Sequence, residues 1–131
     1  EFVQPYTRRI FTALRETGAP LIHFGTGTAT LLSDMSTDGA DVIGVDWRTP
    51  LDEAWDIIGS GHAIQGNLDP ATLLADPDAI KREADDIMRR AGGRPGHIFN
   101  LGHGFHPETP LSSIERLIDN VRAADRVPDL A

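Results

Sequence analysis

The sequence predicts an α/β protein built on a parallel β-sheet, and three observations lead to this fold class. Four short apolar runs are each bounded by glycine or proline, which is typical of buried parallel strands. Amphipathic segments with helical spacing alternate with these runs. A polar and mostly glycine-rich segment follows each run. The expected strands are Leu21–Phe24, Val42–Val45, Ala63–Gly66 and His97–Leu101.

The first half of the chain contains three expected helices. The segment Tyr6–Thr17 has its apolar residues on one face, and Gly18 ends it. After the first strand, Thr28–Thr37 has three apolar residues at positions that suit a helix. After the second strand, Pro50–Ile58 has apolar residues at intervals of three and four, which indicates an amphipathic helix.

The second half of the chain contains two longer expected helices. In Pro77–Ala91 the apolar residues share one face and the acidic residues lie on the other. Two arginines occupy its last turn and Gly92 follows, as the helix dipole and the geometry of helix ends favour. The segment Pro110–Ala124 repeats the apolar pattern.

The order of elements is therefore one helix followed by four strand–helix units. This alternation indicates right-handed βαβ units and a parallel sheet. The local pattern does not decide between an open sheet and part of a closed barrel. Four units amount to half of a (β/α)8 barrel, which needs about 250 residues.

The composition excludes several classes of protein. The chain has 131 residues, enough for one domain with a buried core. It contains no cysteine, which excludes disulfides, thiolate metal sites and a cysteine nucleophile. Its net charge of −8 and the lack of a basic tract lead us to expect no nucleic-acid partner. No apolar run is long enough for a transmembrane helix, so we expect no membrane partner.

The N-terminus gives two expectations. The segment from Glu1 to Pro5 has neither the basic nor the apolar region of a signal peptide, so we expect a cytoplasmic protein. The chain starts on Glu1 with an amphipathic segment already under way, so we also expect that a preceding segment has been removed.

Polar residues gather immediately after the four expected strands. The segments are Gly25–Thr28, Asp46–Arg48, Gln65–Pro70 and Asn100–Gly104. Because the carboxyl ends of parallel strands meet at one edge, we expect these segments to converge there. A small-molecule site at this edge is the resulting hypothesis.

Most of these residues also have a purely structural interpretation. Gly25 and Thr26 belong to a Gly-x-Gly turn that either cradles a phosphate or only turns into a helix. Asp46 either binds a ligand hydroxyl, pairs with Arg48 or caps a backbone group. Asn67 is expected to form an Asx turn and cap the next helix together with its neighbour Asp69, rather than to bind a ligand.

The histidines divide into two groups. His103 lies between two glycines at the end of a strand, where the backbone can project an imidazole, and a functional role is favoured there. Asn100 ends the same strand and is a further candidate. The other histidines are expected to lie in the core, at the rim or in solvent, and they are His23, His62, His97 and His106. Their spacing gives no indication of a metal site.

Two family resemblances compete. Leu21–Thr28 resembles the glycine-rich loop of class I S-adenosylmethionine-dependent methyltransferases, and Asp41–Asp46 resembles their second strand with its ribose-binding acid. The spacing of about 20 residues suits that geometry. This resemblance covers about a quarter of the chain, and the acid expected before the first glycine is replaced by His23.

The second resemblance covers almost the whole chain. In order along the sequence, several blocks are similar to the C-terminal part of uroporphyrinogen decarboxylase. They are Leu21–Gly27, Gly39–Arg48, Leu51–Ala54, Gln65–Pro70, Gly96–Gly104, and Pro107 with Thr109 and Pro110. The combination of GVDWR, QGNLDP and FNLGHG is highly specific. Zinc methyltransferases that act on corrinoid-bound methyl groups resemble this family in fold but need cysteine ligands.

The decarboxylase resemblance implies a fold, an activity and a site. It implies that the chain is the C-terminal half of a (β/α)8 barrel, with the N-terminal half absent. It implies a cytosolic, cofactor-free homodimer that converts the four acetate side chains of uroporphyrinogen III to methyl groups, giving coproporphyrinogen III. His103 matches the substrate-binding histidine of the family's NLGHG motif.

The other functional residues of the family lie in the part that precedes Glu1. They comprise an arginine-containing loop, an aspartate, a tyrosine and a serine, and none can be assigned to this chain. We therefore expect the isolated chain to be inactive, and to need the missing half or a second copy to complete the barrel. A purely structural fragment is the remaining alternative.

Overall fold

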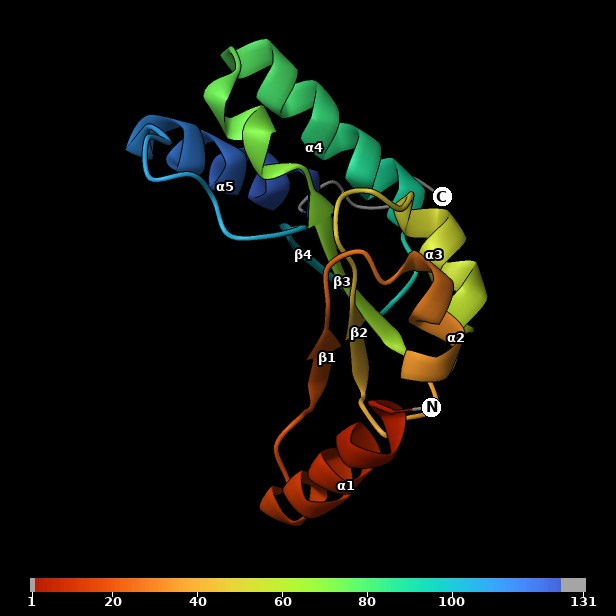
Figure 1. The fold of residues 1–131 in the computed structure, drawn as a ribbon. Helices are drawn as coiled ribbons and strands as arrows, with labels where there is room; N and C mark the ends of the chain where they lie inside the picture. Colours follow the sequence, from red (N-terminus) through yellow and green to blue (C-terminus); the bar gives the residue numbers. More distant parts are fainter. Residues whose placement is uncertain (1, 126–131) are drawn as a thin grey trace.

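The computed structural model describes residues 2–125 and contains four parallel strands that alternate with helices (Figure 1). Glu1, on which the expectation of a removed segment rests, lies outside the described residues. The strands are β1 (Ile22–Phe24), β2 (Val42–Gly44), β3 (Ala63–Leu68) and β4 (His97–Leu101). The α-helices are α1 (Gln4–Leu14), α2 (Leu32–Met35), α3 (Leu51–Ile58), α4 (Pro77–Ala91) and α5 (Leu111–Asp125).

The strands form one sheet in the sequential order β1-β2-β3-β4, and every pair is parallel. This confirms the predicted fold class, although the barrel is not closed. In a doubly wound sheet the first strand pairs with the second and the fourth, whereas here the fourth pairs with the third. The sheet order therefore contradicts the class I methyltransferase alternative.

Helices α2 to α5 form a layer along the sheet, and α1 lies at the end of the sheet where the strands begin (Figure 1). Adjacent helices in the series α2, α3, α4 and α5 contact one another in sequence order, following the strands (Figure 1). Ile43 of β2 and Ile64 of β3 are fully buried against this layer. The core residues of α3 are Leu51, Ala54, Trp55 and Ile58, which confirms the apolar face predicted for this helix.

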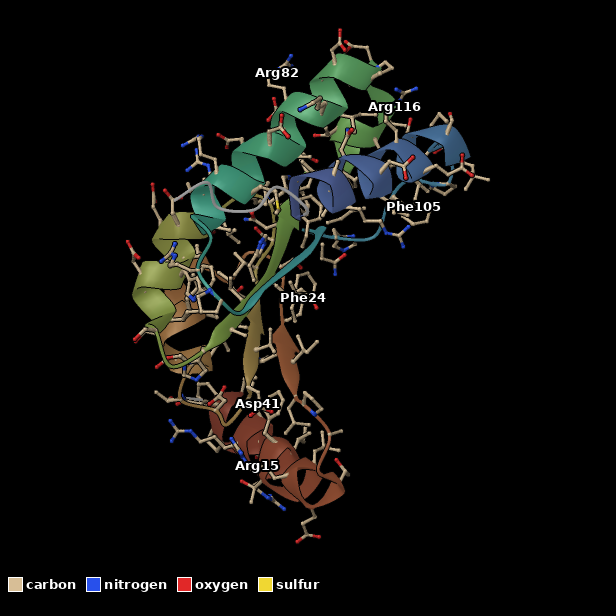
Figure 2. The ribbon with its side chains drawn as sticks, turned by 180° about the vertical axis from the view of Figure 1, so that it is seen from behind. Arg15, Phe24, Asp41, Arg82, Phe105 and Arg116 are labelled. Carbon is tan, nitrogen blue, oxygen red and sulfur yellow. The ribbon has the colours of Figure 1, made fainter. Side chains whose placement is uncertain are left out.

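The opposite face of the sheet is open and partly apolar. The register aligns Phe24, Gly44, Gln65 and Ile98 in one row across the four strands. Phe24 is 44% exposed and Ile98 is 42% exposed, in contrast to the buried isoleucines on the helix side. Figure 2 shows Phe24 on the concave side of the molecule, between α1 and α5. The outer strands β1 and β4 each have a free edge.

Several boundaries differ from the prediction. The expected helix Thr28–Thr37 is a short 3-10 segment, Ala29–Leu31, followed by the four-residue α2. Strand β3 continues two residues beyond Gly66. A further 3-10 helix, Pro70–Leu74, was not predicted. The Asp69 side chain accepts a hydrogen bond from Ala71 N at 2.9 Å and begins this short helix.

Helix α4 has the boundaries that the sequence predicts. The Asp76 carboxylate accepts a hydrogen bond from Ala79 N at 2.9 Å at its start, and Gly92 adopts the left-handed conformation at its end. Arg90 joins α4 to α3, because its Nη1 lies 2.9 Å from Asp52 Oδ1. Its Nε lies 2.7 Å from Asp86 Oδ2 in the same helix. These hydrogen bonds from Arg90 lower the pKa of both carboxyl groups.

The two faces of the sheet predict unequal effects of the same substitution on stability. We expect Ile64→Ala to lower the free energy of unfolding by about 2–5 kcal/mol, because it leaves a cavity in the helix-side core. The matched variant Ile98→Ala removes a side chain from the open face and should change stability by less than about 0.5 kcal/mol. Urea denaturation of both variants tests this, and equal losses would contradict the assignment of the two faces.

Candidate active site

The carboxylate of Asp46 joins the ends of the first two strands. Asp46 is 2% exposed and follows β2. Its Oδ2 accepts a hydrogen bond from the amide of Gly27, which follows β1. Its Oδ1 accepts a hydrogen bond from Arg48 N at 2.9 Å, and Arg48 Nη1 lies 3.4 Å from Oδ2. The carboxylate therefore holds two backbone segments and one guanidinium at the same edge.

The ends of the third and fourth strands are attached to the same segment. Asn67 Nδ2, at the end of β3, donates to Asp46 O at 2.9 Å and to Thr49 O at 2.6 Å. Gly102, after β4, donates its amide to Leu68 O at 2.8 Å. A Cβ added to Gly102 would overlap the backbone of Trp47, so only glycine fits there. The predicted convergence of the four polar strand ends is confirmed.

This packing favours the structural alternatives for Asp46 and for the first loop. Asp46 is buried and both of its oxygens are occupied, so its role is to pair with Arg48 and to hold backbone amides. The Gly27 amide, which a phosphate would need, already donates to Asp46. Gly25 accepts a hydrogen bond from the Thr28 hydroxyl at 3.1 Å and forms a turn, while Thr26 is exposed.

Asn67 and Asp69 have different roles. The prediction that Asn67 caps the following helix is wrong, because Asn67 lies inside β3 and its amide binds backbone carbonyls. Asp69 alone provides the cap. The Asn100 side chain accepts a hydrogen bond from Leu101 N at 2.8 Å and remains exposed at the rim.

His103 is an exposed polar side chain that follows the fourth strand. Its ring meets the ring of Trp47 edge-on, with centroids 6.0 Å apart and planes at 81°. The guanidinium carbon of Arg48 lies 3.9 Å from the centroid of the Trp47 ring. Trp47 therefore contacts two side chains that can donate hydrogen bonds to a carboxylate. Trp47 was not among the site residues predicted from the sequence, although it lies between the candidates Asp46 and Arg48.

A cavity of about 650 Å³ adjoins His103. Most of its lining is apolar and comes from the strand ends, the loop after β4, and α5. Its lining includes Phe24, Asn100, His103, Phe105, Ile118 and Arg122. Figure 2 shows Phe24 and Phe105 on the same concave side of the molecule. The volume suits a bound small molecule, and the apolar wall with a few polar groups is typical of ligand sites.

The remaining histidines do not line this cavity. His97, in β4, contacts the rings of Trp55 and Phe99, and its Nε2 lies 2.9 Å from Gly66 O. Because a carbonyl only accepts, Nε2 carries the proton. Burial lowers the pKa of His97, and the hydrogen bond to Gly66 opposes this effect. This confirms the expectation of a satisfied, half-buried histidine for His97, and His106 is exposed as expected. The same expectation is wrong for His23 and His62, because the Nδ1 atom of each is buried without a hydrogen-bond partner among the described residues.

The described residues offer neither a metal site nor a membrane-spanning helix. Within residues 2–125, no group of three or more His, Asp or Glu side chains is arranged to hold a metal ion. None of the helices in this range is both long and apolar enough to span a bilayer.

The fold and the site define the class of protein. Four sequential strand–helix units carry a polar rim at the carboxyl ends of their strands, as in α/β proteins that bind small molecules at this edge. The family model for uroporphyrinogen decarboxylase (URO-D) matches residues 1–124. The chain therefore belongs to the uroporphyrinogen decarboxylase family.

Individual relatives agree with this assignment. The chain is 52% identical over 126 residues to uroporphyrinogen decarboxylase of Sorangium cellulosum, covering 96% of this chain and 36% of the relative. It is 45% identical over 121 residues to that of Carboxydothermus hydrogenoformans, covering 92% of this chain and 35% of the relative. The chain thus spans about a third of the length of these curated relatives.

A solved structure supports the fold. A methyltransferase from Methanosarcina mazei superimposes with a TM-score of 0.81 at 21% sequence identity, covering 95% of this chain and 36% of that protein. At this identity the likeness concerns the arrangement of strands and helices and not the reaction.

The Asp46 carboxylate gives a stability prediction. Asp46→Ala leaves the Gly27 and Arg48 amides without their acceptor, so we expect the free energy of unfolding to fall by about 1–3 kcal/mol. Asp46→Asn keeps one carbonyl acceptor and should lose less. Urea denaturation tests the order of the two variants. Equal stability of Asp46→Ala and the parent chain would contradict the bonding role.

His97 gives a prediction about pH. In the unfolded chain its pKa is about 6.5, and burial lowers the pKa in the folded state. The unfolded state therefore binds more protons between these two pKa values. The free energy of unfolding should fall as the pH decreases below about 6.5. The contribution of His97 to this fall should level off below its pKa in the folded state.

The matched variant for this prediction is His97→Gln, which keeps an N–H donor for Gly66 but does not titrate. Its free energy of unfolding, measured by urea denaturation from pH 8 to pH 5, should depend less steeply on pH than that of the parent chain. Identical pH profiles would rule out a contribution from His97.

Proposed function

We propose that this chain forms the C-terminal wall of a uroporphyrinogen decarboxylase active site, with His103 as its substrate-binding residue. The observation that carries the proposal is the position of His103, exposed at the rim of an apolar cavity and held edge-on to Trp47. The family assignment supports it. The substrate is a tetrapyrrole with an apolar macrocycle and eight carboxylates, which matches an apolar cavity with sparse hydrogen-bond donors.

The proposed reaction is decarboxylation of pyrrole acetate groups. A pyrrole ring accepts the bonding electrons of the departing carboxylate once its α-carbon has been protonated. The site must stabilise this cationic ring, hold the remaining carboxylates and exclude water. In the proposal, His103 donates a hydrogen bond to a substrate carboxylate, and the apolar wall around Phe24 and Phe105 excludes water.

The groups that complete the reaction lie outside this chain. Stabilising the cationic ring needs a carboxylate, and holding eight carboxylates needs several cations. Within residues 2–125, Asp46 is buried and occupied, and the rim offers Arg48 and His103 as donors. We propose that an N-terminal half provides these groups and closes the barrel against the free edges of β1 and β4. The proposal includes the cytoplasmic homodimer that the family resemblance implies.

A chimera tests this function. In the chimera, this chain takes the place of the 126-residue segment that it matches in the Sorangium cellulosum relative. The part of the relative that precedes this segment is kept and joined to it. We expect the chimera to convert uroporphyrinogen III to coproporphyrinogen III, because the chain then closes a complete site. The product is quantified by chromatography after oxidation to the fluorescent porphyrin. The isolated chain should form no product, because it lacks the groups that hold and protonate the substrate.

Two controls make the result decisive. His103→Ala in the chimera should lower turnover about 10- to 100-fold, since a hydrogen bond to a charged group contributes about 1.5–3 kcal/mol. His106→Ala, a nearby exposed histidine, should leave turnover unchanged. A folded but inactive chimera would refute the proposed function. Turnover by the isolated chain would refute the proposal that the site is incomplete without an N-terminal half. It would also refute the alternative that the chain is a purely structural fragment.

A further inference from the structure

We propose that Trp47 is a positioning residue that sets the orientation of the His103 imidazole. This inference rests on the proposed function, in which His103 contacts a substrate carboxylate. It concerns a residue that has no direct part in that function, and it is carried by three observations: the contact between the two rings, the way Trp47 is anchored, and the exposure of His103.

The first observation is the edge-on contact of the two rings. Their centroids are 6.0 Å apart and their planes are nearly perpendicular, at 81°. This arrangement is the favoured one for aromatic pairs, since the positive edge of one ring meets the negative face of the other. Among the described residues 2–125, Trp47 is the aromatic partner that the His103 ring contacts.

The second observation is that the backbone of Trp47 is fixed. The preceding residue, Asp46, is buried and bound to two amides, and the Asp46 carbonyl accepts a hydrogen bond from Asn67. On the outer side of the ring, the Arg48 guanidinium lies 3.9 Å from the ring centroid. The indole is therefore attached to a constrained segment of the rim.

The third observation is that the His103 side chain is exposed, although the backbone of the preceding Gly102 is fixed by its hydrogen bond to Leu68 O. His103 lies between Gly102 and Gly104, neither of which restricts the loop with a side chain. Gly102 packs directly against the backbone of Trp47, which brings the following residue to the indole. In the proposal, the Trp47 indole is the more fixed of the two rings. Its contact therefore sets the orientation of the His103 imidazole.

This orientation matters for binding and for reaction. A hydrogen bond weakens steeply when its donor points away from the acceptor. A histidine that is already directed at the substrate loses less freedom on binding than one that samples several rotamers. Removing the indole should therefore weaken the function of His103 without removing its imidazole.

A double-mutant cycle in the chimera tests the proposal. Trp47→Leu should lower kcat/KM, by up to about 100-fold for a misplaced group. Trp47→Phe keeps an aromatic ring and should restore most of the loss. In a His103→Ala background, Trp47→Leu should cause no further loss, because Trp47 acts through His103. Additive losses in the cycle would overturn the proposal and assign Trp47 a structural or independent role.

A spectroscopic measurement separates this proposal from the proposed function. With histidines labelled at Cε1, the His103 proton signal in the chimera and in the 131-residue chain should shift in Trp47→Leu, because the ring current of the indole is lost. The His106 signal should not move. An unchanged His103 signal would overturn the positioning role. A chimera that is inactive but shows the shift would refute the decarboxylase function and leave the positioning role standing.

Discussion

The buried carboxylate of Asp46 is the interaction on which the rim of this sheet depends. A carboxylate removed from water must be matched by hydrogen-bond donors, and here the donors are the Gly27 and Arg48 amides. Satisfying the charge therefore fixes the loop after β1 and the segment after β2 together. The adjacent backbone then receives Asn67 from β3 and Gly102 from β4. One electrostatic requirement thus brings four chain segments to a common edge.

The two faces of the sheet support the proposal that this rim belongs to a larger site. The helix-side face is closed by a core around Ile43 and Ile64, whereas Phe24 and Ile98 remain exposed on the other face. Free edges on β1 and β4 leave backbone groups available for pairing. The exposed apolar face and the His103 cavity lie on the concave side (Figure 2). In the proposal, the chain offers an apolar wall with the donors Arg48 and His103 at its rim, and its acidic net charge agrees with the remaining cations coming from elsewhere.

Much of this architecture can be predicted from local sequence patterns. The contacts between its strand ends cannot. Short apolar runs bounded by glycine or proline predict the strands, and parallel pairing then predicts that the polar segments converge. The sequence left the role of Asp46 open, because an aspartate after a strand serves a ligand or a backbone equally well. Asp69-Pro70 signals a helix start, but it begins a separate 3-10 turn. The contact of Trp47 with His103 depends on how β2 and β4 are spaced by β3, which local patterns do not encode.

The most direct test of this account is the affinity of the chimera for the porphyrin product, measured by fluorescence titration with coproporphyrin. If His103 holds a carboxylate at the rim of the apolar cavity, His103→Ala should raise the Kd roughly 10- to 100-fold. The His106→Ala control should bind like the parent chimera. Equal affinity of the His103→Ala variant and the parent would contradict the central claim that this rim is a carboxylate-binding wall.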